Sequence, residues 1–229
     1  MLNWVTKLCI VATFVLIALP ADAAKARRHA HAPILPVDAI GEFLDPAHFA
    51  PVGTITRVPY GCADFCTRRP EECRVDVADP VDVALTPAVM ETLEAVNARA
   101  NAEIEPISNL DHWGTLLDHW DYPVDGKGDC KIYALWKRKL LIDLGFPRQA
   151  LLMTIVRDLE GNGHTILTVK TDRGEFILDN MVGEIRTWDA TGYRFVKRQS
   201  QTDPNVWLAV GPNTTHNAVA GLSGNTRVN

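Results

Sequence analysis

One cysteine in the sequence stands where its thiol could act as a nucleophile. Cys130 follows the stretch Asp125-Gly126-Lys127-Gly128-Asp129, and an apolar helical pattern begins directly after it. Two glycines allow a tight turn and Asp129 can cap a helix, so Cys130 is predicted in the first helical turn. Backbone N–H groups and the helix dipole favour the thiolate there, and a thiolate can attack a carbonyl carbon. The backbone N–H of Cys130 could then stabilise the resulting oxyanion.

Two other interpretations of this stretch fail on their own residues. The Lys-Ser/Thr end of a phosphate-binding P-loop is absent. A calcium-binding EF-hand loop starting at Asp121 would place Pro123 and Ile132 at ligand positions. A buried, purely structural cysteine beside a capped helix is the alternative that remains.

A nucleophilic cysteine needs a base and a group that orients the base. Among the seven histidines, His164 alone begins a predicted strand, directly after Gly161-Asn162-Gly163. The next strand ends at Asp179, and a turn at residues 172–174 brings both residues to the same end of a hairpin. If the register pairs Ile166 with Asp179, the acid is the diagonal same-face neighbour of His164. A register one residue off would place Asp179 on the opposite face.

Two helices are expected before these strands. Thr86-Pro87 is a helix start, and a second helix should begin at Asp129 or Cys130 and stop at Gly145-Phe146-Pro147. The apolar stripe of the first helix contains Val89, Leu93, Val96, Ala100 and Ile104. The predicted buried face of the second contains Ile132, Leu135, Trp136, Leu140 and Leu144.

The second half of the chain changes to a strand pattern rich in β-branched residues. Strands are predicted at Leu151–Arg157, His164–Thr171, Glu175–Asp179 and Tyr193–Val196. Helices followed by an antiparallel sheet define an α+β fold class.

The composition is that of an ordinary globular protein. The chain has 229 residues, of which 47% are hydrophobic and 22% charged, so it is too apolar to be disordered throughout. A formal charge of −5 gives no electrostatic reason to bind nucleic acid. We expect one domain over residues 34–210.

Both ends of the chain differ from this domain. One early Lys, an apolar run from Leu8 to Leu19 and an Ala-x-Ala end predict a secretory signal peptide over residues 1–23, which would remove Cys9. The run is short for a membrane span, which needs roughly 20 apolar residues, although an uncleaved anchor is the alternative. Residues 24–33 are expected to form a flexible basic arm and residues 211–229 a disordered tail.

Several motifs together resemble the bacterial transglutaminase-like cysteine proteinases. Gly-Asp-Cys-x-x-Tyr-Ala at residues 128–134 follows Trp-Asp-Tyr-Pro at 120–123. The likeness continues through Gly-His-Thr-Ile-Leu-Thr-Val from Gly163, Leu-Asp-Asn from Leu178, Trp188, and residues 193–200. It implies a papain-like core on which Cys130, His164 and Asp179 are nucleophile, base and orienting acid.

The resemblance also raises the question of calcium. A branch of periplasmic proteases in this family clips surface adhesins and uses calcium, and its members commonly carry two acids directly after the cysteine. This chain has Lys131 and Ile132 there, and one carboxylate beside a lysine is a poor calcium site. We therefore expect no cofactor and no metal, with Asp129 a ligand only if a calcium site were retained. Lys131 is expected to be solvated, or else to favour the thiolate.

Three further cysteines lie close together in the sequence. Cys62, Cys66 and Cys73 lack the C-x2-C pairs of zinc sites, and in an exported protein they indicate a disulfide. The resemblance favours a Cys66–Cys73 bond with Cys62 left over, and a Cys62–Cys73 bond is the alternative.

These observations lead to one principal hypothesis about function. The chain is expected to be a periplasmic or secreted cysteine peptidase that cleaves a cell-surface or exported protein through an acyl-enzyme on Cys130. Transfer of the acyl group to an amine, as in transglutaminases, is a second enzymatic hypothesis. A non-catalytic binding protein on the same fold is a third.

Overall fold

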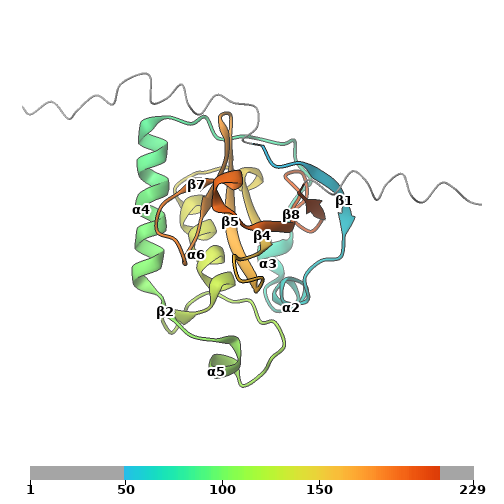
Figure 1. Ribbon diagram of the computed structural model, residues 1–229. Coiled ribbons are helices and arrows are strands. Elements are labelled where there is room, and N and C mark those ends of the chain that lie inside the picture. Colours follow the sequence, from blue (N-terminus) through green and yellow to red (C-terminus); the bar gives the residue numbers. More distant parts are fainter. Residues whose placement is uncertain (1–48, 212–229) are drawn as a thin grey trace, which may run out of the picture. The chain divides into compact units, whose positions relative to one another are not determined.

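Seven strands form one antiparallel sheet in the computed structural model, which describes residues 49–211 (Figure 1). Their order across the sheet is β1-β9-β8-β4-β5-β6-β7, so the first and last strands of the described residues are neighbours. The strands are β1 (Val52–Thr56), β4 (Leu151–Arg157), β5 (Gly163–Thr171), β6 (Gly174–Leu178), β7 (Arg186–Thr187), β8 (Arg194–Gln199) and β9 (Trp207–Val210). The signal peptide and the basic arm predicted from the sequence lie outside the described residues, as does the predicted tail beyond Gly211.

The helices precede the main part of the sheet, which confirms the predicted α+β fold class. They are α2 (Tyr60–Arg68), α3 (Pro70–Cys73), α4 (Pro87–Glu103), α5 (Asn109–Trp113) and α6 (Cys130–Asp143). Helix α6 packs on β5 and β4, and α4 packs on α6 (Figure 1). A short parallel pair, β2 (Glu105–Pro106) with β3 (Lys127–Gly128), joins the end of α4 to the segment before α6.

The start of α4 is the one predicted from the sequence. Thr86 accepts a hydrogen bond from the backbone N–H of Val89 at 3.2 Å, and Pro87 occupies the first helical position. From the predicted stripe, Leu93, Val96 and Ala100 are buried in the core. The helix is therefore held by a capped start and by burial of one face.

Helix α6 starts and ends as predicted, but two of its expected details are wrong. Leu144 is 60% exposed: it is the C-cap residue of a helix that ends at Asp143, directly before the turn at Gly145, whose φ is +88°. Asp129 occupies the N-cap position but its side chain makes no capping hydrogen bond. That carboxylate is paired with the ammonium of Lys131 instead.

The three predicted central strands form as expected, whereas the sheet edges were not predicted. Strands β4, β5 and β6 match the predicted ranges to within a residue at either end. Their side chains are almost all buried, and the sheet has apolar clusters on both of its faces. Strands β1 and β9, like the helices α2 and α3, carry no strong periodic pattern and form through contacts with distant segments.

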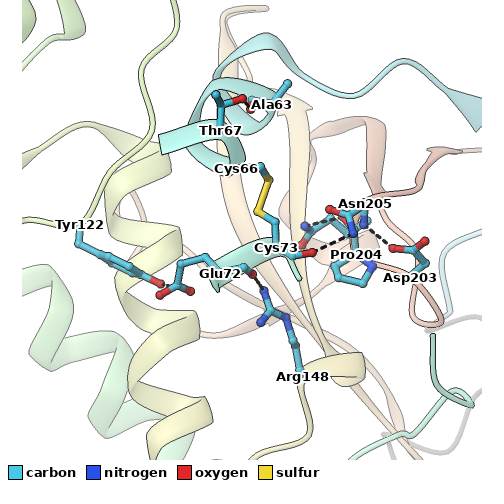
Figure 2. Close-up of a disulfide and its surroundings, with 11 residues drawn as sticks. Ala63, Cys66, Thr67, Glu72, Cys73, Tyr122, Arg148, Asp203, Pro204 and Asn205 are labelled. Carbon is cyan, nitrogen blue, oxygen red and sulfur yellow. Dashed lines mark hydrogen bonds between the residues drawn. A yellow bond between two sulfur atoms is a disulfide. The ribbon is translucent and has the colours of Figure 1, made fainter. Parts of the chain in front are cut away.

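A disulfide closes the turn between α2 and α3. Cys66 and Cys73 are bonded, with their Cα atoms 5.4 Å apart, while Cys62 and Cys130 are free. Figure 2 shows that polar contacts surround this bond: Asn205 donates a side-chain hydrogen bond to the carbonyl of Cys73 at 3.1 Å, and Arg148 donates one to the carbonyl of Glu72. The bonded pair is the one that the resemblance favoured over Cys62–Cys73.

The disulfide-closed pair of helices α2 and α3, here called the α2–α3 hairpin, is hydrogen-bonded to the segment that leads toward Cys130. Asp121 accepts hydrogen bonds from Arg68 at 2.9 Å and from Arg69 at 2.8 Å. The hydroxyl of Tyr122 donates to the carboxylate of Glu72 at 2.8 Å.

Within residues 49–211, no helix is long and apolar enough to cross a membrane.

Removing the disulfide should destabilise the protein without unfolding it. Closing so short a loop is expected to contribute about 2.5 kcal/mol to the free energy of unfolding. The double variant Cys66→Ser, Cys73→Ser should therefore lose about that amount in a urea titration followed by circular dichroism. Added reductant should lower the stability of the wild type and leave that of the double variant unchanged. Equal urea midpoints for the wild type and the variant would contradict the prediction.

Candidate active site

Cys130 is the first residue of α6 and is partly exposed. The backbone before it is held by the short β2–β3 pair, in which Ile107 donates its N–H to the carbonyl of Gly128 at 3.0 Å. Gly128 packs so closely on Ile132 that an added Cβ would lie 2.5 Å from that side chain. The glycine therefore allows the chain to turn tightly into the helix and to present Cys130 at its start.

His164 and Asp179 are joined by a buried hydrogen bond. Nε2 of His164 lies 2.8 Å from Oδ1 of Asp179, and the two residues are only 4% and 3% exposed. The β5–β6 register pairs Leu167 with Leu178, and its next step places Ile166 opposite Asp179. This is the register in which His164 and Asp179 are diagonal same-face neighbours.

The imidazole of His164 also interacts with the thiol of Cys130. A side-chain hydrogen bond between the two residues and the charge of the thiolate both act on the ring. Since Nε2 faces Asp179, the other nitrogen, Nδ1, is left for the sulfur. The structure thus brings together the three residues that were expected to form the triad, whereas the Cys66–Cys73 bond belongs to the α2–α3 hairpin.

Tyr193 is a further member of this cluster, and the sequence did not reveal its role. Its hydroxyl donates a hydrogen bond to Oδ2 of Asp179 at 2.7 Å, and its ring lies edge-on to that of His164 with centroids 5.8 Å apart. The backbone N–H of Met181 donates to Oδ1 of Asp179 at 3.0 Å, and Asn101 donates to its backbone carbonyl at 2.9 Å. Tyr193 directly precedes β8, and only the turn of the chain after residue 179 brings it to the carboxylate.

These contacts set the charges of the cluster. Burial alone would lower the pKa of His164, but its hydrogen bonds to Asp179 and Cys130 outweigh burial and raise this pKa to about 9. Burial alone would raise the pKa of Asp179, but the hydrogen bond and positive charge of His164, with the Met181 and Tyr193 donors, hold it below its usual range. His164 is therefore favoured as an imidazolium below about pH 9.

Lys131 is buried next to Cys130, which corrects the expectation of a solvated lysine. The residue is 7% exposed, and its ammonium pairs with the carboxylate of Asp129 and, at 3.1 Å, with Oδ1 of Asp118. Burial alone would lower the pKa of Lys131, but Asp129, Asp118 and the thiolate of Cys130 together raise it. Asp118 lies well before the nucleophile in the sequence, so this contact had no local signal.

Solved structures of one bacterial protease are similar to this chain. Calcium-bound LapG of Legionella pneumophila is 27% identical, with a TM-score of 0.46 over 55% of this chain and 71% of that chain. A second LapG structure is 28% identical, with a TM-score of 0.42 over 50% of this chain and 65% of that chain. An EGTA-treated LapG structure is 24% identical, with a TM-score of 0.46 over 62% and 74%. No curated protein matches the sequence.

The family is established by the sequence itself. The model of the bacterial transglutaminase-like cysteine proteinases matches residues 52–215, which include α6 and all seven strands of the sheet. Cys130, His164, Asp179 and Tyr193 all lie within the matched range. The chain belongs to the bacterial transglutaminase-like cysteine proteinases and is a cysteine peptidase of that type.

Proposed function

We propose that the chain hydrolyses a peptide bond in a protein substrate, with Cys130 as nucleophile, His164 as base and Asp179 as orienting acid. The observation that carries the proposal is the buried 2.8 Å hydrogen bond between His164 and Asp179, with the same imidazole bonded to Cys130 at a helix start. This is the arrangement of nucleophile, base and orienting group that covalent acyl transfer needs.

The reaction begins when the thiolate of Cys130 attacks the carbonyl carbon of the scissile bond. The oxyanion that forms is stabilised by the backbone N–H of Cys130, because the first N–H groups of a helix have no acceptor within the helix. The imidazolium of His164 gives its proton to the leaving amine, which departs and leaves a thioester on Cys130. His164 then takes a proton from water, which attacks the thioester and releases the new carboxylic acid.

Asp179 and Tyr193 have orienting roles in this proposal. Asp179 holds the ring so that Nδ1 faces the sulfur and keeps the imidazolium charged. Tyr193 is a positioning residue, because its hydroxyl donates to Asp179 at 2.7 Å and so fixes the second carboxylate oxygen. No step in this sequence uses a cofactor.

Hydrolysis is favoured over transfer of the acyl group to an amine. Water needs no acceptor pocket, and no feature of the described residues marks a second substrate site beside Cys130. The membership of a peptidase family also argues against a binding protein without turnover.

The location of the protein is a further part of the proposal. Residues 1–23 have the pattern of a cleaved signal peptide, which would place the mature chain in the periplasm or outside the cell. The free energy that the Cys66–Cys73 bond contributes is available only in an oxidising compartment, and such a bond fits an exported protein. A surface or exported protein is then the accessible kind of substrate.

Loss of the nucleophile should abolish cleavage in cells. A strain carrying Cys130→Ala should accumulate one or more surface or secreted proteins that the parent cleaves, with the cleavage rate lowered by at least about a thousandfold. Comparison of protein termini in the two strains by mass spectrometry measures this. Free carboxyl groups at the new C-termini indicate hydrolysis, and amine-linked ends indicate transfer.

A matched control uses the second free cysteine. Cys62 is buried, and burial raises the pKa of its thiol to about 11. A strain carrying Cys62→Ala should therefore cleave the same proteins as the parent strain. Identical termini in the parent and in Cys130→Ala would overturn the proposed reaction.

The charge of His164 should depend on Asp179. With a pKa of about 9, His164 is protonated below that pH and loses its proton as the pH rises through it. Asp179→Asn removes a negative charge that holds this proton, so the titration midpoint of the imidazole should move to lower pH by about one unit or more. NMR titration of the His164 ring measures the midpoint. Asp143→Asn, an exposed change near the end of α6, should leave it in place. An unmoved midpoint in Asp179→Asn would contradict the assignment.

Export should be visible at the N-terminus of the mature protein. Cleavage after Ala23 would leave Ala24 as the first residue. Edman sequencing of the protein from the periplasmic and culture fractions measures this directly. An intact Met1 in protein recovered from the membrane fraction would instead support an uncleaved anchor.

A further inference from the structure

We propose that the ammonium of Lys131 is a built-in cation that joins Asp118 to Asp129 beside the nucleophile and makes this protease independent of calcium. The inference rests on the proposed function only in treating Cys130 as the nucleophile. It concerns Lys131, the residue that directly follows Cys130.

The first support is the geometry of the ammonium. Lys131 pairs with the carboxylate of Asp129 and lies 3.1 Å from Oδ1 of Asp118, with its side chain only 9% exposed. The two carboxylates belong to different segments, one to the loop after α5 and the other to the N-cap position of α6. The lysine thus lies where a cation is needed to hold two negative groups from different parts of the chain together.

Asp118 is also fixed from its other side. Its Oδ2 accepts a hydrogen bond from the indole of Trp120 at 2.8 Å, and Trp120 is 1% exposed. Gly61 of α2 packs against both residues, since an added Cβ would lie 2.3 Å from Trp120 and 2.6 Å from Asp118. The carboxylate therefore has one oxygen for the indole and one for Lys131.

The nearby acids offer calcium no free set of ligands. Calcium takes six to eight oxygen ligands at about 2.3–2.6 Å, usually with several carboxylates among them. Asp121 is already bound by Arg68 and Arg69. Among residues 49–211, no cluster of three or more acidic, histidine or cysteine side chains could hold a metal ion. Calcium between Asp118 and Asp129 would displace a buried ammonium and leave it without a partner, which is strongly unfavourable.

The pairing of Lys131 with Asp118 and Asp129, here called the tether, has two consequences at the site. It connects the start of α6 to the segment held by the α2–α3 hairpin, so that the backbone on both sides of Cys130 is fixed. It also places a permanent positive charge near the sulfur, where it interacts with the thiolate. Because Lys131 is part of the chain, the cation that produces both effects cannot dissociate.

The test measures stability and metal binding rather than activity. For the wild-type protein, thermal melting should be the same in 1 mM calcium chloride and in EGTA, and calorimetric titration with calcium should give no binding heat. Lys131→Met removes the ammonium but keeps a long side chain, so its melting temperature should fall by roughly 5–10 °C. Lys131→Glu should bind calcium in the calorimeter and melt at a higher temperature with calcium than with EGTA.

The matched control is Lys139→Met in the same helix. Lys139 is partly exposed, with its side chain 40% accessible, and it pairs with Asp143 on the surface, so its loss should leave the melting temperature nearly unchanged. Calcium binding by the wild type, or equal melting temperatures for Lys131→Met and Lys139→Met, would overturn the proposal. The same measurements on a Cys130→Ala background separate it from the proposed reaction, because the tether does not need the thiol.

Discussion

The antiparallel pairing of β5 with β6 is the constraint on which the candidate site depends. Nearly every side chain of both strands is buried, so a slip of one residue would reverse which side chains face each cluster of the core. The same slip would move Asp179 to the opposite face from His164. The packing of the core therefore sets the geometry of the two residues, and the hydrogen bond between them is a consequence of the register that the core selects.

Buried charges around the nucleophile occur in compensated groups. His164 is compensated by Asp179, and Lys131 by Asp129 and Asp118. In each group the partners come from different elements or segments, so the electrostatic interaction also holds those parts of the fold together. A buried ion pair costs much of its attraction in lost hydration, but removing one partner leaves an uncompensated charge. Other arrangements of these residues are therefore disfavoured, because each would leave a buried charge without its partner.

The features that could be predicted from the sequence are those with a local cause. Thr86 and Pro87 start α4 by capping, and the β-branched runs give β4 to β6, with a turn that joins β5 to β6. Those elements placed His164 and Asp179 at the same end of one hairpin, but the register that brings them to one face comes from the structure and not from the sequence pattern. The positions of the ends of β5 and β6 could be predicted without any distant contact, because the turn that joins the two strands is short.

The remaining features depend on contacts between distant segments. Strand β1 is an edge of the sheet because it pairs with β9, and neither strand has a strong pattern of its own. The same holds for the contact of Lys131 with Asp118 and for that of Tyr193 with Asp179. Leu144 was expected to be buried from its spacing alone, but the helix ends before that residue can reach the core.

The pairing of β1 with β9 bears on the order in which the protein is assembled. The two strands come from opposite ends of the described chain, and Val52 lies opposite Val210. A contact between such distant segments forms late, because the entropy of closing the intervening chain must be overcome first. During synthesis, β1 leaves the ribosome first and has no neighbour in the sheet until β9 follows. The hairpin that carries His164 and Asp179 can therefore be in place before the sheet has its outer edge.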